Sequence, residues 1–254
     1  MKVTPKKRLG QHFLTDESVA EQIVASLKAS NRHVLEVGPG MGVLTKYLLQ
    51  QPLLDFSVVE LDSESVEYLK VHYPALAPRI MEADFLTLKL DELYQDNLTI
   101  IGNFPYNIST QIMFKMLEYK SLVTELVGMF QKEVAERIAS APGSKQYGIL
   151  SVLVQAFYDV EYLFTVSEHQ FFPPPQVKSA VIRVTKNPTK QLHCDENLFK
   201  QVVKAAFNQR RKTIRNSLKM YNFVDGFSAS PLFNLRPEQL SVAQFEDICT
   251  HIIK

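Results

Sequence analysis

The chain has 254 residues, of which 46% are hydrophobic and 22% charged, and its formal net charge is +1. This length and composition predict a globular protein with one sizeable core, and they exclude a disordered or low-complexity chain. The two cysteines and six histidines lack metal-ligand spacing, and we find neither a signal peptide nor an apolar stretch long enough to span a membrane. We therefore expect a cytoplasmic protein with reduced cysteines, no metal and no membrane association.

Positive charge is concentrated in two segments that contain no acidic residue. Residues 1–10 carry four basic side chains and residues 199–220 carry seven, together eleven of the 28 in the chain. The rest of the chain is therefore acidic. This distribution predicts a polyanionic partner that binds at defined surfaces.

The region from about Asn31 to Val184 alternates short β-branched runs with amphipathic stretches, which is typical of βαβ units around a mostly parallel sheet. The predicted strands are His33–Val37, Asp55–Glu60, Arg79–Ala83, Leu98–Ile101, Thr124–Phe130, Asp159–Thr165 and Ser179–Val184. The predicted helices include Gly42–Gln50, Ser63–His72, Ser109–Tyr119 and Lys132–Ser140. The connection between the last two strands, residues 166–178, is proline-rich, so we expect it to be non-helical and those strands to be antiparallel.

A glycine-rich turn, Gly38-Pro39-Gly40-Met41-Gly42, follows the first predicted strand and leads into a helix. Glycines allow the backbone to approach a ligand, and the helix start offers free N–H groups. The spacing is neither that of a dinucleotide site nor that of a triphosphate loop. The turn therefore predicts a site for a nucleoside without a pyrophosphate, although such a turn is also common as a purely structural element.

Two carboxylates end the next strands and point to the same crevice, because ligands of open α/β sheets bind beyond the carboxyl ends of the strands. Glu60 ends the second strand and can accept both hydroxyls of a ribose. Asp84 follows the third strand and can accept a hydrogen bond from the amino group of an adenine. A helix N-cap or turn aspartate explains Asp84 equally well.

The segment Asn103-Phe104-Pro105-Tyr106 follows the fourth strand and is the most specific motif. The exocyclic amine of a base is a poor nucleophile, and two acceptors, the Asn103 side-chain oxygen and the Pro105 carbonyl, can bind its two N–H groups. No general base of unusual pKa is needed for attack on a sulfonium methyl group. Tyr106 can stack on a base that has left its helix. An ordinary Asn-x-Pro turn before a helix is the alternative.

The segment Phe171-Phe172-Pro173-Pro174-Pro175 lies in the proline-rich connection. An aromatic ring held on this stiff segment can form the opposite wall of a slot for a base, and we expect this ring to be that of Phe171. The alternative is a proline-rich turn that Phe171 or Phe172 anchors in the core.

After Val184 the composition changes, and residues 186–190 have the character of a linker followed by helical patterns. We therefore predict two domains, residues 1–185 and a small helical domain over residues 186–254. If the helix over residues 200–219 is unbroken, one face carries basic residues opposite an apolar face. Such a face can follow a phosphate backbone, whereas a solvated face normally mixes charge signs. The RNA-binding residues that we expect are Lys204, Arg210, Arg211, Lys212 and Arg215.

These segments together closely resemble the KsgA-type ribosomal RNA adenine dimethyltransferases of the Erm and KsgA superfamily, over almost the whole chain. The similarity covers residues 9–14, 36–40, 59–62, 83–85, 103–106, 130–137, 171–179 and 206–218. The last of these segments is similar to the KsgA C-terminal domain and differs from that of the Erm enzymes.

The resemblance implies a Rossmann-like methyltransferase domain with a helical C-terminal domain, and S-adenosylmethionine as the cofactor. It implies transfer of two methyl groups to each of two adjacent adenosines near the 3′ end of 16S rRNA, by a monomer acting on an immature small ribosomal subunit. By motif match, the residues that bind the cofactor are His12, Leu14, Gly38, Glu60, Asp84 and Asn103. Many family members have Asn where this chain has His12.

Other functions are compatible with parts of this pattern. An Erm-like enzyme that methylates large-subunit RNA is the nearest, and a DNA adenine or glutamine methyltransferase shares the Asn-Phe-Pro-Tyr type of motif. The DNA enzyme is disfavoured because only about 65 residues follow the linker, fewer than a recognition module needs. A ribosome-assembly or RNA-binding factor without catalysis is the alternative from another class.

Overall fold

The computed structural model describes residues 3–28, 33–51 and 55–253, which form two compact units. The first unit takes its described residues from Met1–Ala135 and Val160–Lys186, and the second from Glu136–Asp159 and Asn187–Lys254. Lys2 of the basic N-terminal segment and the predicted start of the sheet region at Asn31 lie outside the described residues. Among the described helices, none combines the length and hydropathy needed to cross a lipid bilayer.

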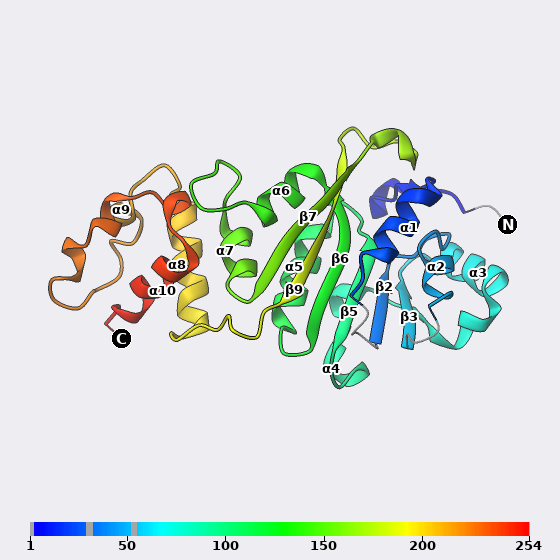
Figure 1. Ribbon diagram of the computed structural model, residues 1–254, viewed down its shortest axis with the longest axis horizontal. Helices are drawn as coiled ribbons and strands as arrows, with labels where there is room; N and C mark the ends of the chain where they lie inside the picture. The colour runs from blue at the N-terminus through cyan, green and yellow to red at the C-terminus, as the bar shows by residue number, and fades with distance from the viewer. Residues whose placement is uncertain (1–2, 29–32, 52–54, 254) are drawn as a thin grey trace. The chain divides into compact units, whose positions relative to one another are not determined.

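A seven-stranded sheet forms the centre of the first unit (Figure 1). Its strands are β2 (His33–Val37), β3 (Asp55–Glu60), β4 (Ile80–Glu82), β5 (Leu98–Asn103), β6 (Val123–Gln131), β7 (Tyr158–Val166) and β9 (Ser179–Lys186). They lie in the order β4-β3-β2-β5-β6-β9-β7. The neighbours from β4 to β6 are parallel, and β9 is antiparallel to β6. The predicted α/β class with a mostly parallel sheet is confirmed.

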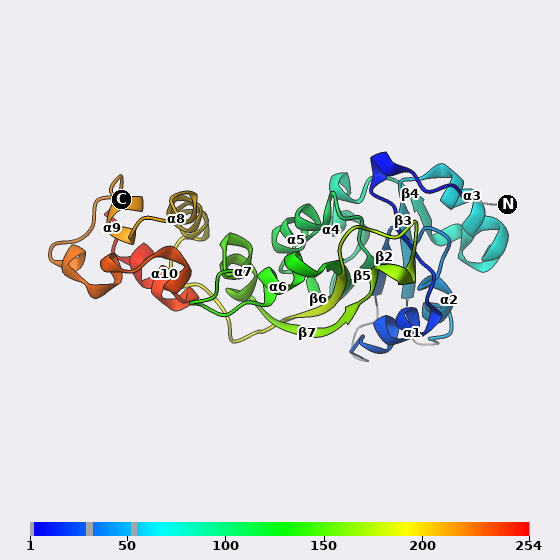
Figure 2. The same cartoon turned by 90° about the horizontal axis from the view of Figure 1, so that it is seen from above.

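Helices cover both faces of this sheet, and Figures 1 and 2 show α1 and α2 on one face and α5 on the other. Apolar residues of the first three helices, among them Ile23, Leu48 and Leu69, pack into one core cluster with residues of the strands. Because both faces are covered, β5 is buried along almost its whole length. The helices are α1 (Glu17–Ala25), α2 (Thr45–Leu48), α3 (Ser63–His72), α4 (Leu90–Leu93), α5 (Ser109–Glu118) and α6 (Lys132–Ala139).

A second, two-stranded sheet joins the N-terminal segment to the proline-rich connection. Strand β1 (Phe13–Leu14) pairs antiparallel with β8 (Phe171–Phe172). The connection was expected to be non-helical, but a 3₁₀ turn over Glu168–Gln170 precedes β8. Ser167 stabilises this turn because its backbone N–H donates to the Gln170 side chain at 3.1 Å. The short sheet places residues 12 and 173 next to each other.

The second unit is helical, with α7 (Ile149–Gln155), α8 (Glu196–Asn208), α9 (Ile214–Ser217) and α10 (Val242–Thr250). It includes residues 136–159, which the predicted boundary at residues 185 and 186 assigns to the first domain. Gln155 of α7 donates to the carbonyls of Ile138 and Ser140 at 2.9 and 2.8 Å. The Tyr147 ring lies 6.2 Å from the Phe207 ring of α8. These contacts join α7 and the end of α6 to α8.

The basic segment of the second unit is not one unbroken helix. The prediction of a single basic face required an unbroken helix over residues 200–219, and this requirement is not met. Helix α8 ends at Asn208, and α9 begins only at Ile214. The intervening residues 209–213 include no apolar side chain that could hold the turn against the core. In addition, the Ile214 N–H donates to the Leu235 carbonyl at 2.8 Å in place of a helical partner.

Candidate functional site

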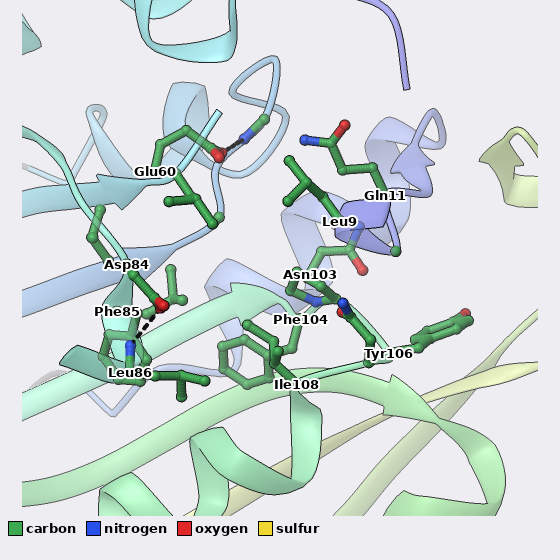
Figure 3. A pocket seen from close by; sticks show the side chains of 18 of the residues that line it. Leu9, Gln11, Glu60, Asp84, Phe85, Leu86, Asn103, Phe104, Tyr106 and Ile108 are labelled. Atoms are coloured by element: carbon green, nitrogen blue, oxygen red, sulfur yellow. Dashed lines mark hydrogen bonds between the residues drawn. The ribbon is translucent and has the colours of Figure 1, made fainter. Parts of the chain in front are cut away.

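The carboxyl ends of β2, β3, β4 and β5 lie at the same edge of the sheet. The strand order reverses between β2 and β5, because the chain runs outward from β2 to β4 and then continues on the other side of β2 with β5. Gly38, Glu60, Asp84 and Asn103 lie at or just beyond these ends. All four line one hollow, the first pocket, which encloses about 900 Å³ including space open to solvent. Figure 3 shows Glu60, Asp84 and Asn103 around it. The structure therefore brings together the residues that were predicted from separate strand ends.

The glycine turn after β2 forms one wall of the first pocket. Gly38 and Gly40 have φ angles of +68° and +56°, a left-handed conformation that side chains other than glycine rarely adopt. A Cβ atom at Gly40 would lie 2.8 Å from Cε1 of Phe13. The turn therefore needs glycine both for its conformation and for the close approach of β1. This wall suits a ligand that contacts backbone.

Glu60 is 5% exposed, and backbone N–H groups hold its carboxylate from two sides. The Gly40 N–H donates to Oε2 at 3.0 Å, and the Asp62 N–H donates to Oε1 at 2.8 Å. Burial raises the pKa of Glu60, and these two hydrogen bonds oppose that shift. Each oxygen keeps an accepting position. The geometry fits a carboxylate that accepts the two hydroxyls of a ribose.

A second carboxyl group lies beneath the glycine turn. Glu36 of β2 is 1% exposed, and its Oε2 accepts the Thr45 hydroxyl at 2.7 Å. Burial, with a smaller contribution from the charge of Glu60, raises the pKa of Glu36 to about 8. Burial thus favours the protonated form of Glu36 at neutral pH.

Asp84 serves as a cap and also lines the first pocket. Its Oδ1 accepts the Leu86 N–H at 2.9 Å, which begins the 3₁₀ turn Phe85–Thr87 (Figure 3). Lys115 of α5 is 7% exposed and donates to the carbonyls of Leu86 and Leu88. Lys115, which the sequence did not suggest, therefore fixes the segment that carries Asp84. The second oxygen of Asp84 is the one that can accept an amino group.

Asn103 and the motif that follows it lie at the end of β5. The Nδ2 of Asn103 donates to the His12 carbonyl at 2.9 Å, which leaves Oδ1 as a free acceptor among the described residues. The Pro105 carbonyl accepts the Ile108 N–H at 3.2 Å and keeps one further lone pair. The Tyr106 hydroxyl pairs with Ser179 Oγ at 2.6 Å. Two acceptors for an exocyclic amine are therefore close in sequence and line the same pocket.

A second pocket adjoins the first and shares Gly10, Gln11, His12 and Tyr106 with it. Phe172 and the three prolines of residues 173–175 form part of its lining. Phe172 is 58% exposed, whereas Phe171 is 4% exposed and belongs to the core cluster. The ring that the structure presents at this pocket is thus that of Phe172, because adjacent residues of β8 point to opposite faces. A role of Phe171 at the site stays a prediction.

The other two residues expected to bind the cofactor come from the N-terminal segment. His12 lines both pockets. Leu14 is 3% exposed and packs into the core cluster, so its predicted contact with the cofactor stays untested.

Several apolar residues of the first pocket were missed in the sequence. They are next to the predicted polar residues: Leu61 follows Glu60, and Phe85 follows Asp84. Leu61 is 52% exposed and lines the pocket, which suits a residue at the rim of a ligand site. Their position directly beside the end of a strand was the feature of the sequence that could have identified them. Leu9 and Ile108 also belong to this apolar lining.

The basic N-terminal segment does not present all of its charges to solvent. Lys6 forms ion pairs with Asp62 and with Glu64, the latter at 3.3 Å. Burial opposes the shift, but hydrogen bonds from Lys6 and Gln11 lower the pKa of Asp62. Lys6 therefore holds the segment beside the first pocket, and Lys7 and Arg8 are the exposed cations among the described residues of this segment.

In the second unit, four of the five predicted RNA-binding residues, Lys204, Arg211, Lys212 and Arg215, are exposed. Arg210 is half-buried: it donates to the Lys145 carbonyl at 2.5 Å and lies 3.9 Å from the Glu238 carboxylate. Arg215 also lies over the Phe233 ring at 5.7 Å. The segment thus offers free positive charge on α8, on the turn after it and on α9.

Residues 3–253 match the model of the family described as ribosomal RNA adenine dimethylase. Among curated relatives, the chain is 58% identical over 253 residues to the ribosomal RNA small subunit methyltransferase A of Bacteroides thetaiotaomicron. The aligned region covers 98% of this chain and 94% of that protein. It is 55% identical over 249 residues to the protein of the same name from Cytophaga hutchinsonii, which covers 97% and 96%.

Two solved structures share the fold over nearly the whole chain. A dimethyladenosine transferase from Plasmodium falciparum superimposes with a TM-score of 0.78 at 24% identity, covering 93% of this chain and 96% of that one. The 23S rRNA methyltransferase ErmE superimposes with a TM-score of 0.69 at 24% identity, covering 94% and 100%. At this identity the likeness concerns the fold alone.

Proposed function

The chain belongs to the ribosomal RNA adenine dimethylase family, and we propose that it dimethylates N6 of two adjacent adenosines near the 3′ end of 16S rRNA. The observation that carries this proposal is the match of residues 3–253 to the family, together with relatives 55–58% identical that are named for the small subunit. The protein is an S-adenosylmethionine-dependent methyltransferase. In this proposal Asn103 and Pro105 bind the amino group of the target adenine.

The first pocket fits this cofactor in shape and chemistry. The glycine turn leaves room for backbone contact, Glu60 accepts the ribose hydroxyls, and the second oxygen of Asp84 accepts the adenine amino group. Leu61 and Phe85 supply apolar surface for the adenine. Bound S-adenosylmethionine supplies an electrophilic methyl group on a sulfonium.

The residues at the end of β5 orient the acceptor amine. Asn103 Oδ1 and the Pro105 carbonyl accept its two N–H groups and favour a tetrahedral nitrogen whose lone pair faces the methyl group. Transfer of the methyl group to this nitrogen would break the methyl–sulfur bond, with its electron pair going to sulfur and S-adenosylhomocysteine leaving, and the methylated, positively charged nitrogen would release one proton to water. A histidine or cysteine base is not needed because this proton is strongly acidic. The second pocket, with Tyr106 and Phe172, receives the base outside its helix.

RNA is the partner of this family, and exposed basic residues of both units support RNA binding by the chain. Lys7, Arg8, Lys204, Arg211, Lys212 and Arg215 contact phosphates, which position the RNA without reading its sequence. Arg210 contributes less because Lys145 and Glu238 already engage it. In this proposal the protein acts in the cytoplasm as a monomer, on an immature small ribosomal subunit.

The alternatives differ in their predicted products. An Erm-like activity would modify large-subunit RNA, but the likeness to ErmE extends to the fold alone. A non-catalytic assembly factor would bind cofactor and RNA without turnover. The acceptor geometry at Asn103 favours catalysis over that function.

One assay separates these functions. The protein is incubated with labelled S-adenosylmethionine and small subunits from a strain that lacks the modification, and the labelled nucleosides are identified and mapped. We expect N6,N6-dimethyladenosine at two adjacent positions near the 3′ end of 16S rRNA. Label in large subunits instead would indicate the Erm-like activity, and binding without label would indicate the assembly factor.

A further inference from the structure

His12 occupies the junction of the two pockets and lines both of them. The paired residues of β1 and β8 end at Phe13 and Phe172, and His12 and Pro173 follow them on the two segments. Nδ1 of His12 donates to the Pro173 carbonyl at 2.8 Å. The imidazole thus extends the contact between the two segments beyond the short sheet and holds the proline wall of the second pocket.

The backbone of His12 acts on the other side of the junction. Its carbonyl accepts a hydrogen bond from Nδ2 of Asn103 at 2.9 Å. Because the amide group is planar, this bond turns Oδ1 of Asn103 away from His12. The His12 ring also stacks on Tyr106, with centroids 5.4 Å apart and planes inclined by 29°. A hydrogen bond to Ser179 fixes the far end of Tyr106.

We infer that His12 is a positioning residue that fixes the distance between Asn103, which orients the amine that receives the methyl group, and two walls of the second pocket, Pro173 and Tyr106. This inference rests on the proposed function. Its consequence is greatest for the second methyl transfer, because the acceptor nitrogen then carries a methyl group and must fit between these walls. A slot with a loose wall allows the bulkier amine to lie in more orientations, so the second transfer slows more than the first.

Three variants separate the ring from its hydrogen bond. His12→Phe keeps an aromatic ring against Tyr106 but removes the Nδ1 donor. His12→Asn keeps an N–H donor close to the position of Nδ1 but removes the ring. His12→Ala removes both. The matched control is His33→Asn, because His33 lies at the opposite end of β2 and pairs with Asp55 at 3.0 Å.

The measurement is the ratio of monomethylated to dimethylated adenosine, determined by nucleoside mass spectrometry at saturating cofactor, with KM and kcat for the subunit substrate. We expect His12→Phe to raise this ratio at least about fivefold, the factor that corresponds to one hydrogen bond. His12→Ala raises it further, and His12→Asn restores it toward the value of the parent protein. His33→Asn leaves the ratio unchanged.

A purely structural role would lower the melting temperature and the amount of active protein without changing the product ratio. An unchanged ratio in folded His12→Phe and His12→Ala would therefore overturn the inference. If the parent protein itself forms no methylated adenosine, the proposed function fails, and that outcome is distinct from a failure of the variants alone.

Discussion

Glu60 and Glu36 show how two carboxyl groups on neighbouring strands acquire different roles. Two backbone N–H groups donate to Glu60, whereas the Thr45 hydroxyl donates to Glu36. The donors favour the charged form of Glu60, and burial favours the neutral form of Glu36. The two N–H groups thus support a charged acceptor at the position that we propose for the ribose hydroxyls.

Replacing Glu60 with Ala removes the charged acceptor of the ribose hydroxyls. We expect the affinity for S-adenosylhomocysteine to fall by about 1.5 to 3 kcal/mol, with little change in RNA affinity. Isothermal titration calorimetry measures the first quantity. Glu82→Ala is the control, since Glu82 is an exposed carboxylate at the end of the adjacent strand β4. Equal affinities of the Glu60 and Glu82 variants would remove Glu60 from the site.

Replacing Asn103 with Ala removes one of two acceptors for the target amine. By analogy with the loss of one preorganised transition-state hydrogen bond, the rate should fall about 100-fold or more, or roughly 3 kcal/mol. Affinity for the RNA particle should persist because phosphate contacts dominate it. The rate is compared at saturating cofactor. Dimethylation by the folded variant at nearly the parent rate would refute the proposed mechanism.

Glu36 links stability to pH. Its pKa of about 8 in the folded chain exceeds the ordinary value of 4.5, so the folded state holds a proton that the unfolded state releases. The contribution of Glu36 is fully present below about pH 4.5 and is lost as the pH rises to about 8. Relative to Glu36→Gln, the parent should lose up to about 1.4 kcal/mol per pH unit in this window. Urea unfolding at pH 5, 6.5 and 8 measures the difference, and a constant difference would contradict the assignment.

At the scale of elements, the basic segment is divided between the 13-residue helix α8, a turn and the short helix α9. The break at residues 209–213 means that Lys204 of α8 and Arg215 of α9 are not aligned by a common helix axis. Charge density, and not a helical stripe, is therefore the property to test.

Replacing Lys204, Arg211 and Arg215 with Gln should weaken binding to the RNA particle and reduce its salt dependence. Each lost phosphate contact lowers the slope of log affinity against log salt by roughly 0.7 to 0.9. The control variant has Gln in place of Lys46, Lys70 and Lys89. It loses the same number of positive charges, but each of these lysines forms an ion pair with a glutamate. If both triple variants have the same slope, the basic segment is only a solvated surface.

At the scale of the whole molecule, a ligand that binds only the folded chain stabilises it by mass action. At 100 times its dissociation constant, S-adenosylhomocysteine should add about 2.7 kcal/mol to the free energy of unfolding. Chemical unfolding with and without the ligand measures this. ATP is the control ligand. Because the glycine turn does not have the sequence of a triphosphate-binding loop, ATP should not raise the free energy of unfolding of the protein. Equal stabilisation by both would indicate a non-specific nucleotide pocket.

The sequence by itself determined the sheet and the polar ends of its strands. β2, β3 and α3 have the predicted bounds, because alternating β-branched runs, caps and glycine turns act over a few residues. Glu60, Asp84 and Asn103 could be found for the same reason: each directly ends or follows a strand, and parallel strands end at one edge.

Only the tertiary structure decided what distant segments do to one another. The hydrogen bonds of His12 reach Asn103 and Pro173, which are 91 and 161 residues away. Burial of Phe171, exposure of Phe172 and the end of α8 at Asn208 likewise depend on packing partners elsewhere in the chain. Local pattern contains no record of these partners, so it predicted the residues of the site but not the contacts that orient them.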